Sequence, residues 1–220
     1  MTSNGKMYTT VIEKLKFEPK LDESNITVSI QGDHDIVVLG GKVSSYNEKL
    51  IAEHAVKSLA KVRSIANEIE VDLAIKYTQS DVDLAKAVTR TLKSLASVPS
   101  DHIQSVIQDG VVSLSGEVYW QFQKNNAFNA IKDLIGIKSI INKIVIKQSA
   151  KVDASQIQQH IIEEFERHAR LDANKIKVIV VGDKVTLEGK VTHFSEIDDA
   201  EDAAWSTPGV QKVENNITIG

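Results

Sequence analysis

The chain has 220 residues with 26 basic and 30 acidic side chains, which gives a formal net charge of −4, and it contains no cysteine. This acidic balance argues against broad electrostatic attraction to nucleic acid, and the missing cysteines exclude disulfides, thiolate metal sites and a cysteine nucleophile. With 42% hydrophobic and 25% charged residues the composition predicts a globular chain, and no window of about 18 to 20 apolar residues predicts a transmembrane segment.

Residues 1–20 lack the apolar stretch of about 7 to 15 residues that follows a basic start in a secretory signal. We therefore expect a cytoplasmic location. A mature chain from which a signal has been removed would look the same, so a periplasmic location is the alternative.

The first helix is expected before Pro19, where a helical apolar spacing ends. Two strands of alternating pattern follow around the sequence GDHD, and the second of them reads VVLGGKV at 37–43. Ser45 with Glu48 three residues later is a capping box, which predicts the start of a second helix. An apolar run at 65–71 predicts a closing strand.

The same order of elements returns twice along the chain. Further first helices are expected behind capping residues, at Ser80 or Asp81 and at Asp153. Each is followed by two alternating runs joined by a dipeptide that suits a tight hairpin turn, Asp109-Gly110 and Gly182-Asp183. The closing strands are expected at 140–146 and 213–219.

Three strand glycines, Gly41, Gly116 and Gly189, bring these copies into alignment at separations of 75 and 73 residues. Each has valine 2 residues later, alanines 11 and 14 residues later, asparagine 26 residues later and isoleucine 28 residues later. We therefore predict an α+β fold of three tandem αββαβ modules, each a three-stranded sheet with two helices packed on one face. The modules are expected at residues 7–76, 81–148 and 153–220.

Glycine inside a strand usually marks a bulge, a bend or the close approach of another backbone. Because alanines lie on the following helix, we predict tight helix–sheet contact at the three strand glycines, with a ligand at the exposed backbone as the alternative. Gly136 and Gly209 occupy the turn between the second helix and the last strand, and they too are interpreted as structural. The first module has Lys61 at this place, so its turn is expected to differ.

The glycine strand, the alanine-bearing helix, the Gly-Val-x-x-V turn and the closing Asn-x-Ile resemble the BON domain, which is named for bacterial osmotically induced and nodulation proteins. The resemblance extends over nearly the whole chain in three copies. It implies an αββαβ fold, a link to envelope and osmotic stress, export from the cytoplasm in most members, and suspected attachment to phospholipid surfaces or other macromolecules.

No catalytic motif is recognisable: HExxH, G-x-S-x-G and nucleotide-binding glycine loops are all missing, so no enzyme activity and no cofactor are predicted. The six histidines are His34, His54, His102, His160, His168 and His193, of which only His160 has acids nearby on a helix, Glu163 and Glu164. The acidic stretch at 195–202 suits a helix start. A weak cation site of Glu196, Asp198, Asp199 and Asp202 is the less favoured alternative, and no metal site is predicted.

The sequence YWQFQKNN at 119–126 is the candidate contact site, with Tyr119, Trp120, Phe122 and Lys124. Its aromatic residues are interpreted either as packing between modules, the favoured alternative, or as an exposed patch for lipid headgroups or a protein. The middle third of the chain, residues 77–149, is the only one with positive net charge, +2 against −1 before it and −5 after it. This positive charge favours an anionic surface as the partner of the middle unit.

We predict a non-enzymatic, stress-associated binding or scaffold protein that attaches to an anionic phospholipid surface or to a protein partner. The short linkers at 77–80 and 148–152 keep the modules close, so that weak contacts can combine. The alternative is a protein that senses a small ligand or a cation in an osmotic or ionic response.

Overall fold

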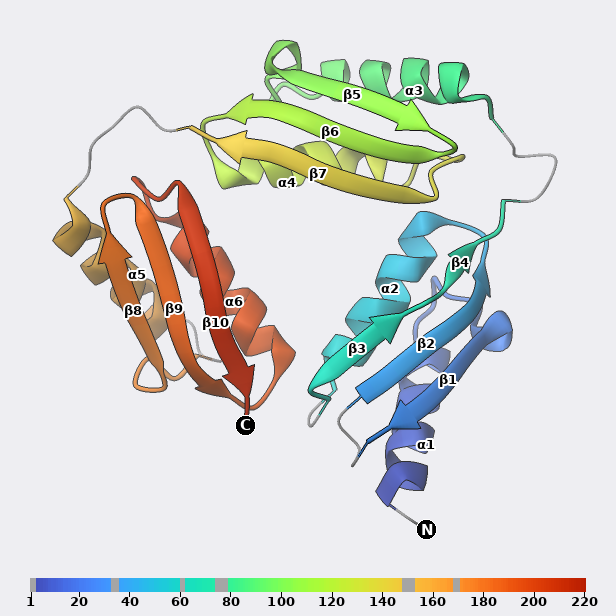
Figure 1. Ribbon diagram of the computed structural model, residues 1–220, viewed down its shortest axis with the longest axis horizontal. Coiled ribbons are helices and arrows are strands. Elements are labelled where there is room, and N and C mark those ends of the chain that lie inside the picture. Colours follow the sequence, from blue (N-terminus) through green and yellow to red (C-terminus); the bar gives the residue numbers. More distant parts are fainter. Residues whose placement is uncertain (1–2, 33–35, 60–61, 74–78, 148–152, 168–170) are drawn as a thin grey trace.

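A computed structural model describes residues 3–32, 36–59, 62–73, 79–147, 153–167 and 171–220 (Figure 1). His34, Lys61, His168 and most of the two predicted linkers lie outside these ranges. The first unit consists of α1 Ser3–Lys16, β1 Ile26–Gln31, β2 Ile36–Val43, α2 Tyr46–Lys57, β3 Ser64–Asn67 and β4 Glu70–Val71. The second consists of α3 Asp81–Ser94, β5 Ile103–Gln108, β6 Val111–Val118, α4 Gln121–Ile131 and β7 Ser139–Ile146. The third consists of α5 Ala154–Arg167, β8 Ile176–Val181, β9 Lys184–Val191, α6 Phe194–Ser206 and β10 Lys212–Ile219.

Each unit has its own sheet, in which the glycine strand is central. The central strand pairs antiparallel with the strand before it and parallel with the strand after the second helix. The register also repeats, since each strand glycine faces the first residue of the preceding strand: Ile26↔Gly41, Ile103↔Gly116 and Ile176↔Gly189. In the first unit the last strand is divided into β3 and β4. The predicted α+β fold of three αββαβ modules is confirmed.

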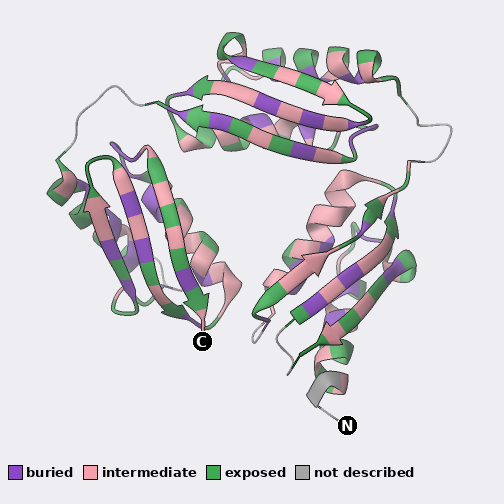
Figure 2. Ribbon diagram, viewed as in Figure 1, coloured by how far each residue is buried: buried purple, intermediate pink, exposed green. Residues whose placement is uncertain are grey.

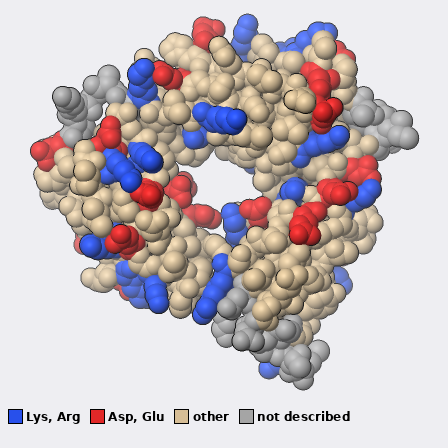
Figure 3. Space-filling view, in the orientation of Figure 1, with Lys and Arg blue, Asp and Glu red and all other residues tan. Residues whose placement is uncertain are grey.

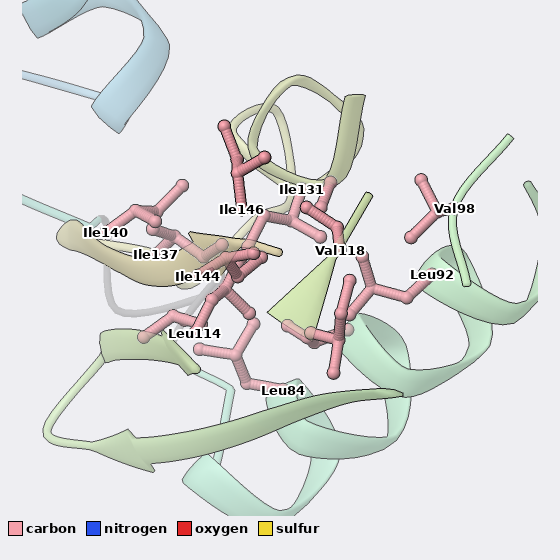
Figure 4. Close-up of a cluster of buried hydrophobic side chains, with 14 residues drawn as sticks. Leu84, Leu92, Val98, Leu114, Val118, Ile131, Ile137, Ile140, Ile144 and Ile146 are labelled. Carbon is pink, nitrogen blue, oxygen red and sulfur yellow. The ribbon is translucent and has the colours of Figure 1, made fainter. Parts of the chain in front are cut away.

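Each unit also encloses a separate hydrophobic core between its sheet and its helices (Figure 2). In the second unit Leu84, Val88 and Leu92 form one face of α3 and contact Leu114 of the central strand's inner face (Figure 4). Burying one such aliphatic side chain contributes roughly 1.5–3 kcal/mol. Each unit therefore has a core of its own instead of sharing a single one.

The strand glycines make room for a neighbouring backbone. A Cβ at Gly41, Gly116 or Gly189 would lie 2.0, 2.0 or 2.1 Å from the carbonyl oxygen of Asn25, His102 or Lys175. These carbonyls belong to the residue just before the adjacent strand, so the predicted reason, tight packing against the alanine-bearing helix, is wrong. Side chains are excluded here because adjacent strands approach closely.

The repeated asparagines join the last strand to the second helix. In each unit the side-chain amide of Asn67, Asn142 or Asn215 donates to a carbonyl of that helix, and its oxygen accepts the N–H two residues later. For Asn142 these bonds measure 3.3 Å to Lys124 O and 3.2 Å from Ile144 N. The Asn-x-Ile motif is thus a clamp: asparagine satisfies two backbone groups, and the isoleucine is buried.

The units surround a central opening, which remains visible in the space-filling view (Figures 1 and 3). The second helices α2, α4 and α6 lie nearest this opening. Within the described parts of the chain, no helix is long and apolar enough to cross a membrane.

Candidate functional site

The aromatic residues of the candidate contact site form a corner where β6 ends and α4 begins. Tyr119, Trp120 and Phe122 keep 50%, 40% and 53% of their surface exposed. About half of each residue is thus open to solvent, which favours the alternative of an exposed patch over packing between modules. We call Tyr119, Trp120 and Phe122 the aromatic corner.

The backbone of the aromatic corner is held by Gln123. Its side-chain oxygen accepts hydrogen bonds from the N–H groups of Tyr119 (3.0 Å) and Trp120 (3.1 Å). Trp120 takes the extended conformation of an N-cap residue, but its own side chain does not cap the helix. The Gln123 N–H donates instead to the backbone carbonyl of Trp120 (3.1 Å), and the indole takes no part in capping because it has no hydrogen-bond acceptor.

In the other two units the aromatic residue at this corner packs against another unit. Each has an aromatic as the first residue of its second helix, Tyr46 in α2 and Phe194 in α6, and both pack against the core of a neighbouring unit. At this position the middle unit has Gln121, and aromatics flank it instead. The exposed aromatic corner is therefore particular to the middle unit.

Lys124 does not extend into the solvent beside these rings. It is half-buried on α4, and burial lowers its pKa although the Glu201 carboxylate of α6 attracts the ammonium group. Lys124 thus contributes to the contact between the second and third units. As a direct ligand for an anionic surface it is poorly placed.

A different lysine borders the aromatic corner. The backbone N–H of Lys147 donates to the Val118 carbonyl (2.8 Å), so Lys147 lies across the sheet from the residue preceding Tyr119. Its ammonium group is 2.9 Å from a Glu117 oxygen, in a pair whose side chains are 69% and 54% exposed. Such an exposed pair is weak, on the order of 0–1 kcal/mol, so the ammonium group can turn to another anion. Lys147 is 25 or more residues from the aromatics in sequence, and only the strand register brings it there.

The corresponding corner of the first unit is an open polar cleft. It is lined by Asp22, Asn25, Lys42, Val43, Ser44, Glu48 and Asp72. Lys42 and Asp72 are 3.0 Å apart and repeat the Glu117–Lys147 pair with the charges exchanged. The two corners thus have the same backbone arrangement, but the first unit exposes polar and charged side chains where the second exposes aromatic ones.

The acidic stretch at 195–202 does not converge on one point. Glu196 is only 7% exposed, and its carboxylate accepts the N–H groups of Thr192 and His193 at 2.9 Å each. Asp198 instead lies near Lys57 and His54 of the first unit. Glu163 and Glu164, the predicted neighbours of His160, both pair with Arg167. Among the described residues, no three histidine or acidic side chains are grouped so that they could hold a metal ion.

Comparisons with known proteins agree with the repeated architecture. The sequence profile of the BON domain matches residues 8–72, 80–148 and 153–220. Osmotically-inducible protein Y of Escherichia coli (strain K12) is 29% identical over 134 residues, covering 58% of this chain and 67% of that protein. An uncharacterized protein in the gshII 5' region of Anaplasma centrale is 27% identical over 129 residues, covering 57% of this chain and 84% of its own.

A solved structure of CdsD, a structural protein of the type III secretion system of Chlamydia trachomatis, aligns with 98% of this chain and 92% of its own. The identity is 14% and the TM-score is 0.27, so this likeness supports no conclusion about the chain.

Proposed function

Because the chain belongs to the BON-domain family, we propose that it is a stress-associated protein of the cell envelope that attaches to an anionic phospholipid surface. Its similarity to an osmotically-inducible protein supports the link to osmotic stress. That link favours the periplasmic location over the cytoplasmic one expected from the first residues. We propose a binding role without catalysis, exerted by the modules at 7–76, 81–148 and 153–220.

The observation that supports this proposal is the aromatic corner. Tyrosine and tryptophan are enriched where membranes meet water, because their rings suit the headgroup region and their polar atoms stay hydrated. Here a tyrosine and a tryptophan are exposed together with a phenylalanine, in the unit with positive net charge and beside Lys147. A lipid phosphate can replace Glu117 as the partner of that lysine.

The contact is small, so the proposed attachment is weak and reversible. Peripheral binding strengthens with buried apolar area and with attraction to anionic lipids. Several weak contacts on one chain add up only when their spacing fits the target. We therefore expect binding that depends on the fraction of anionic lipid and falls as salt is added.

Co-sedimentation with vesicles tests the proposal. The wild type should sediment with vesicles containing phosphatidylglycerol and stay in solution with pure phosphatidylcholine. Trp120→Ser should weaken binding about tenfold, since one interfacial aromatic is lost, without lowering the melting temperature. The matched control is Phe17→Ser, which removes a ring that is 82% exposed in the first unit and should change nothing.

Two results would contradict the proposal: equal binding by the wild type and Trp120→Ser, or no sedimentation of the wild type with either vesicle. In the second case a protein partner becomes the better occupant of the aromatic corner. The cation-sensing alternative has no support from side-chain grouping in the described residues. A melting temperature that rises with one cation, compared with others at equal ionic strength, would revive it.

A further inference from the structure

The contacts between units repeat in one direction around the ring. Tyr46 begins α2 of the first unit and packs against the core of the second. Phe194 begins α6 of the third unit and packs against the core of the first. Trp205, near the end of α6, contacts the cores of both the second and third units. The start of one second helix therefore meets the next unit, and the ring closes head to tail.

Charged groups show the same direction. Asp198 in the first half of α6 interacts with Lys57 and His54 at the end of α2. Lys124 in the first half of α4 interacts with Glu201 of α6. Where the start of one helix meets the end of another, the positive end of one helix dipole lies near the negative end of the other, which is favourable.

One of the three junctions differs from the others because no linker crosses it. The first and second units are consecutive in the chain, as are the second and third, so each pair is held at high effective concentration. The first and third units are not consecutive, and the contacts between their described residues include the side chains of Phe194, Asp198, Lys57 and His54. We call this non-covalent junction the clasp.

The clasp contains unfavourable as well as favourable contacts. Partial removal from water raises the pKa of Asp198, and this effect exceeds the attraction of Lys57 and His54. Glu201 and Asp199 of its own helix add repulsion. Lys57 is shared, since its ammonium group also lies 3.2 Å from a Glu53 oxygen. Phe194 adds an apolar contact at the clasp, because it packs against the core of the first unit.

The geometry points to a clasp that opens reversibly and can be remade with a second copy of the chain. Opening uncovers Phe194 on one unit and its receiving surface on another. A head-to-tail contact joins different surfaces, so the same contact can form within one chain or between two. The second copy is thus the partner that fits, because it carries both halves of the clasp. This inference is independent of lipid attachment, which uses the aromatic corner.

Cysteine cross-linking can test the closed state, since the chain has no native cysteine. Lys57→Cys with Asp198→Cys should be joined within one chain by a short bismaleimide. The control pair is Lys57→Cys with Asp183→Cys, because Asp183 precedes the eight residues of β9 and lies at the opposite end of that strand from the start of α6, where Asp198 is. It should not be joined. Adding Phe194→Ser to the first pair should lower the closed-to-open ratio about tenfold, and with it the initial rate of cross-linking.

Exchange with a second copy needs two singly substituted chains. When Lys57→Cys and Asp198→Cys proteins are mixed at high concentration, mixed dimers linked between positions 57 and 198 should exceed both like-with-like dimers. Peptide mass mapping identifies each link. Failure of the double variant to join within one chain would refute the clasp. Joining within the chain, but no excess of mixed dimers, would show a clasp that does not exchange and would overturn the proposal.

Discussion

Two glycines of the third unit offer a matched test of why the motif requires glycine. Gly189 lies in β9, and a Cβ there would lie 2.1 Å from Lys175 O and 3.2 Å from the Ile176 Cα. Gly182 lies in the β8–β9 turn at φ +65°, and a Cβ there would meet nothing within 4 Å. Gly189→Ala therefore introduces a clash, whereas Gly182→Ala introduces backbone strain alone.

The expected costs differ by about 2 kcal/mol in free energy of unfolding. A Cβ at this distance must push the start of β8 away, and such overpacking costs about 1–3 kcal/mol, here at the upper end. The shift also weakens a hydrogen bond between the two strands, which is worth about 1 kcal/mol. Together these give about 3–4 kcal/mol for Gly189→Ala. A left-handed alanine costs about 1–2 kcal/mol, which is the expectation for Gly182→Ala.

Hydrogen exchange of peptides from β8 and β9 measures these changes in the third unit alone, because local opening is read in each segment separately. We expect protection in both strands to fall far more for Gly189→Ala than for Gly182→Ala, with peptides of β5 and β6 little changed. Equal losses, or a larger loss for Gly182→Ala, would refute the argument that close strand approach selects glycine.

Three further variants test other parts of the structure. Burial acts to raise the pKa of Glu196, but hydrogen bonds from Thr192 and His193 lower it overall. The ionised carboxylate therefore stabilises the folded protein above the ordinary pKa of about 4.3, and this contribution is lost as pH falls through the lowered pKa. Glu196→Ala should cost about 1–2 kcal/mol near neutral pH, whereas Glu196→Gln should retain most of the stability and lose its acid-side pH dependence, as urea titrations would show. Gln121→Met should raise stability by about 1 kcal/mol in the same assay, because the buried Gln121 Oε1 has no hydrogen-bond partner; a loss would mean that the oxygen is satisfied in solution. Asn142→Ala should cost about 2 kcal/mol because two partly buried backbone groups lose their partner, while the exposed Asn129→Ala should cost almost nothing; similar costs would reject the clamp.

The internal repeat made the architecture predictable. Period-two runs around Asp109-Gly110 marked a hairpin, and the turn has the expected positive φ at both residues. Ser45 and Ser80 accept the N–H three residues later, as N-cap residues do. These signals are local in the chain, so a single sequence contains them.

The choice among the usual reasons for a strand glycine could not be made from the sequence, because it depends on the backbone of an adjacent strand. The alanines near Gly189 in sequence suggested helix packing, whereas the blocking atom belongs to Lys175. Lys124 shows the same difficulty at the candidate site: its type suggested a solvent-facing cation, but a neighbouring unit partly buries it. Lys147 was overlooked because only the register of β6 with β7 places it beside the aromatic corner.

The arrangement of the three units relative to one another also could not be predicted from the sequence. Tyr46 and Phe194 resemble ordinary helix-starting residues, and nothing local indicates that each packs against another unit. Contacts between modules depend on shape complementarity over whole surfaces, which leaves no periodic signal in the chain.

The most direct test of membrane attachment uses tryptophan fluorescence. The chain has two tryptophans, so Trp205→Phe leaves Trp120 of the aromatic corner as the only indole. With anionic vesicles that contain brominated lipids, its emission should shift to shorter wavelength and be quenched, because the ring enters the headgroup region. Emission that neither shifts nor is quenched at saturating anionic lipid would contradict the account.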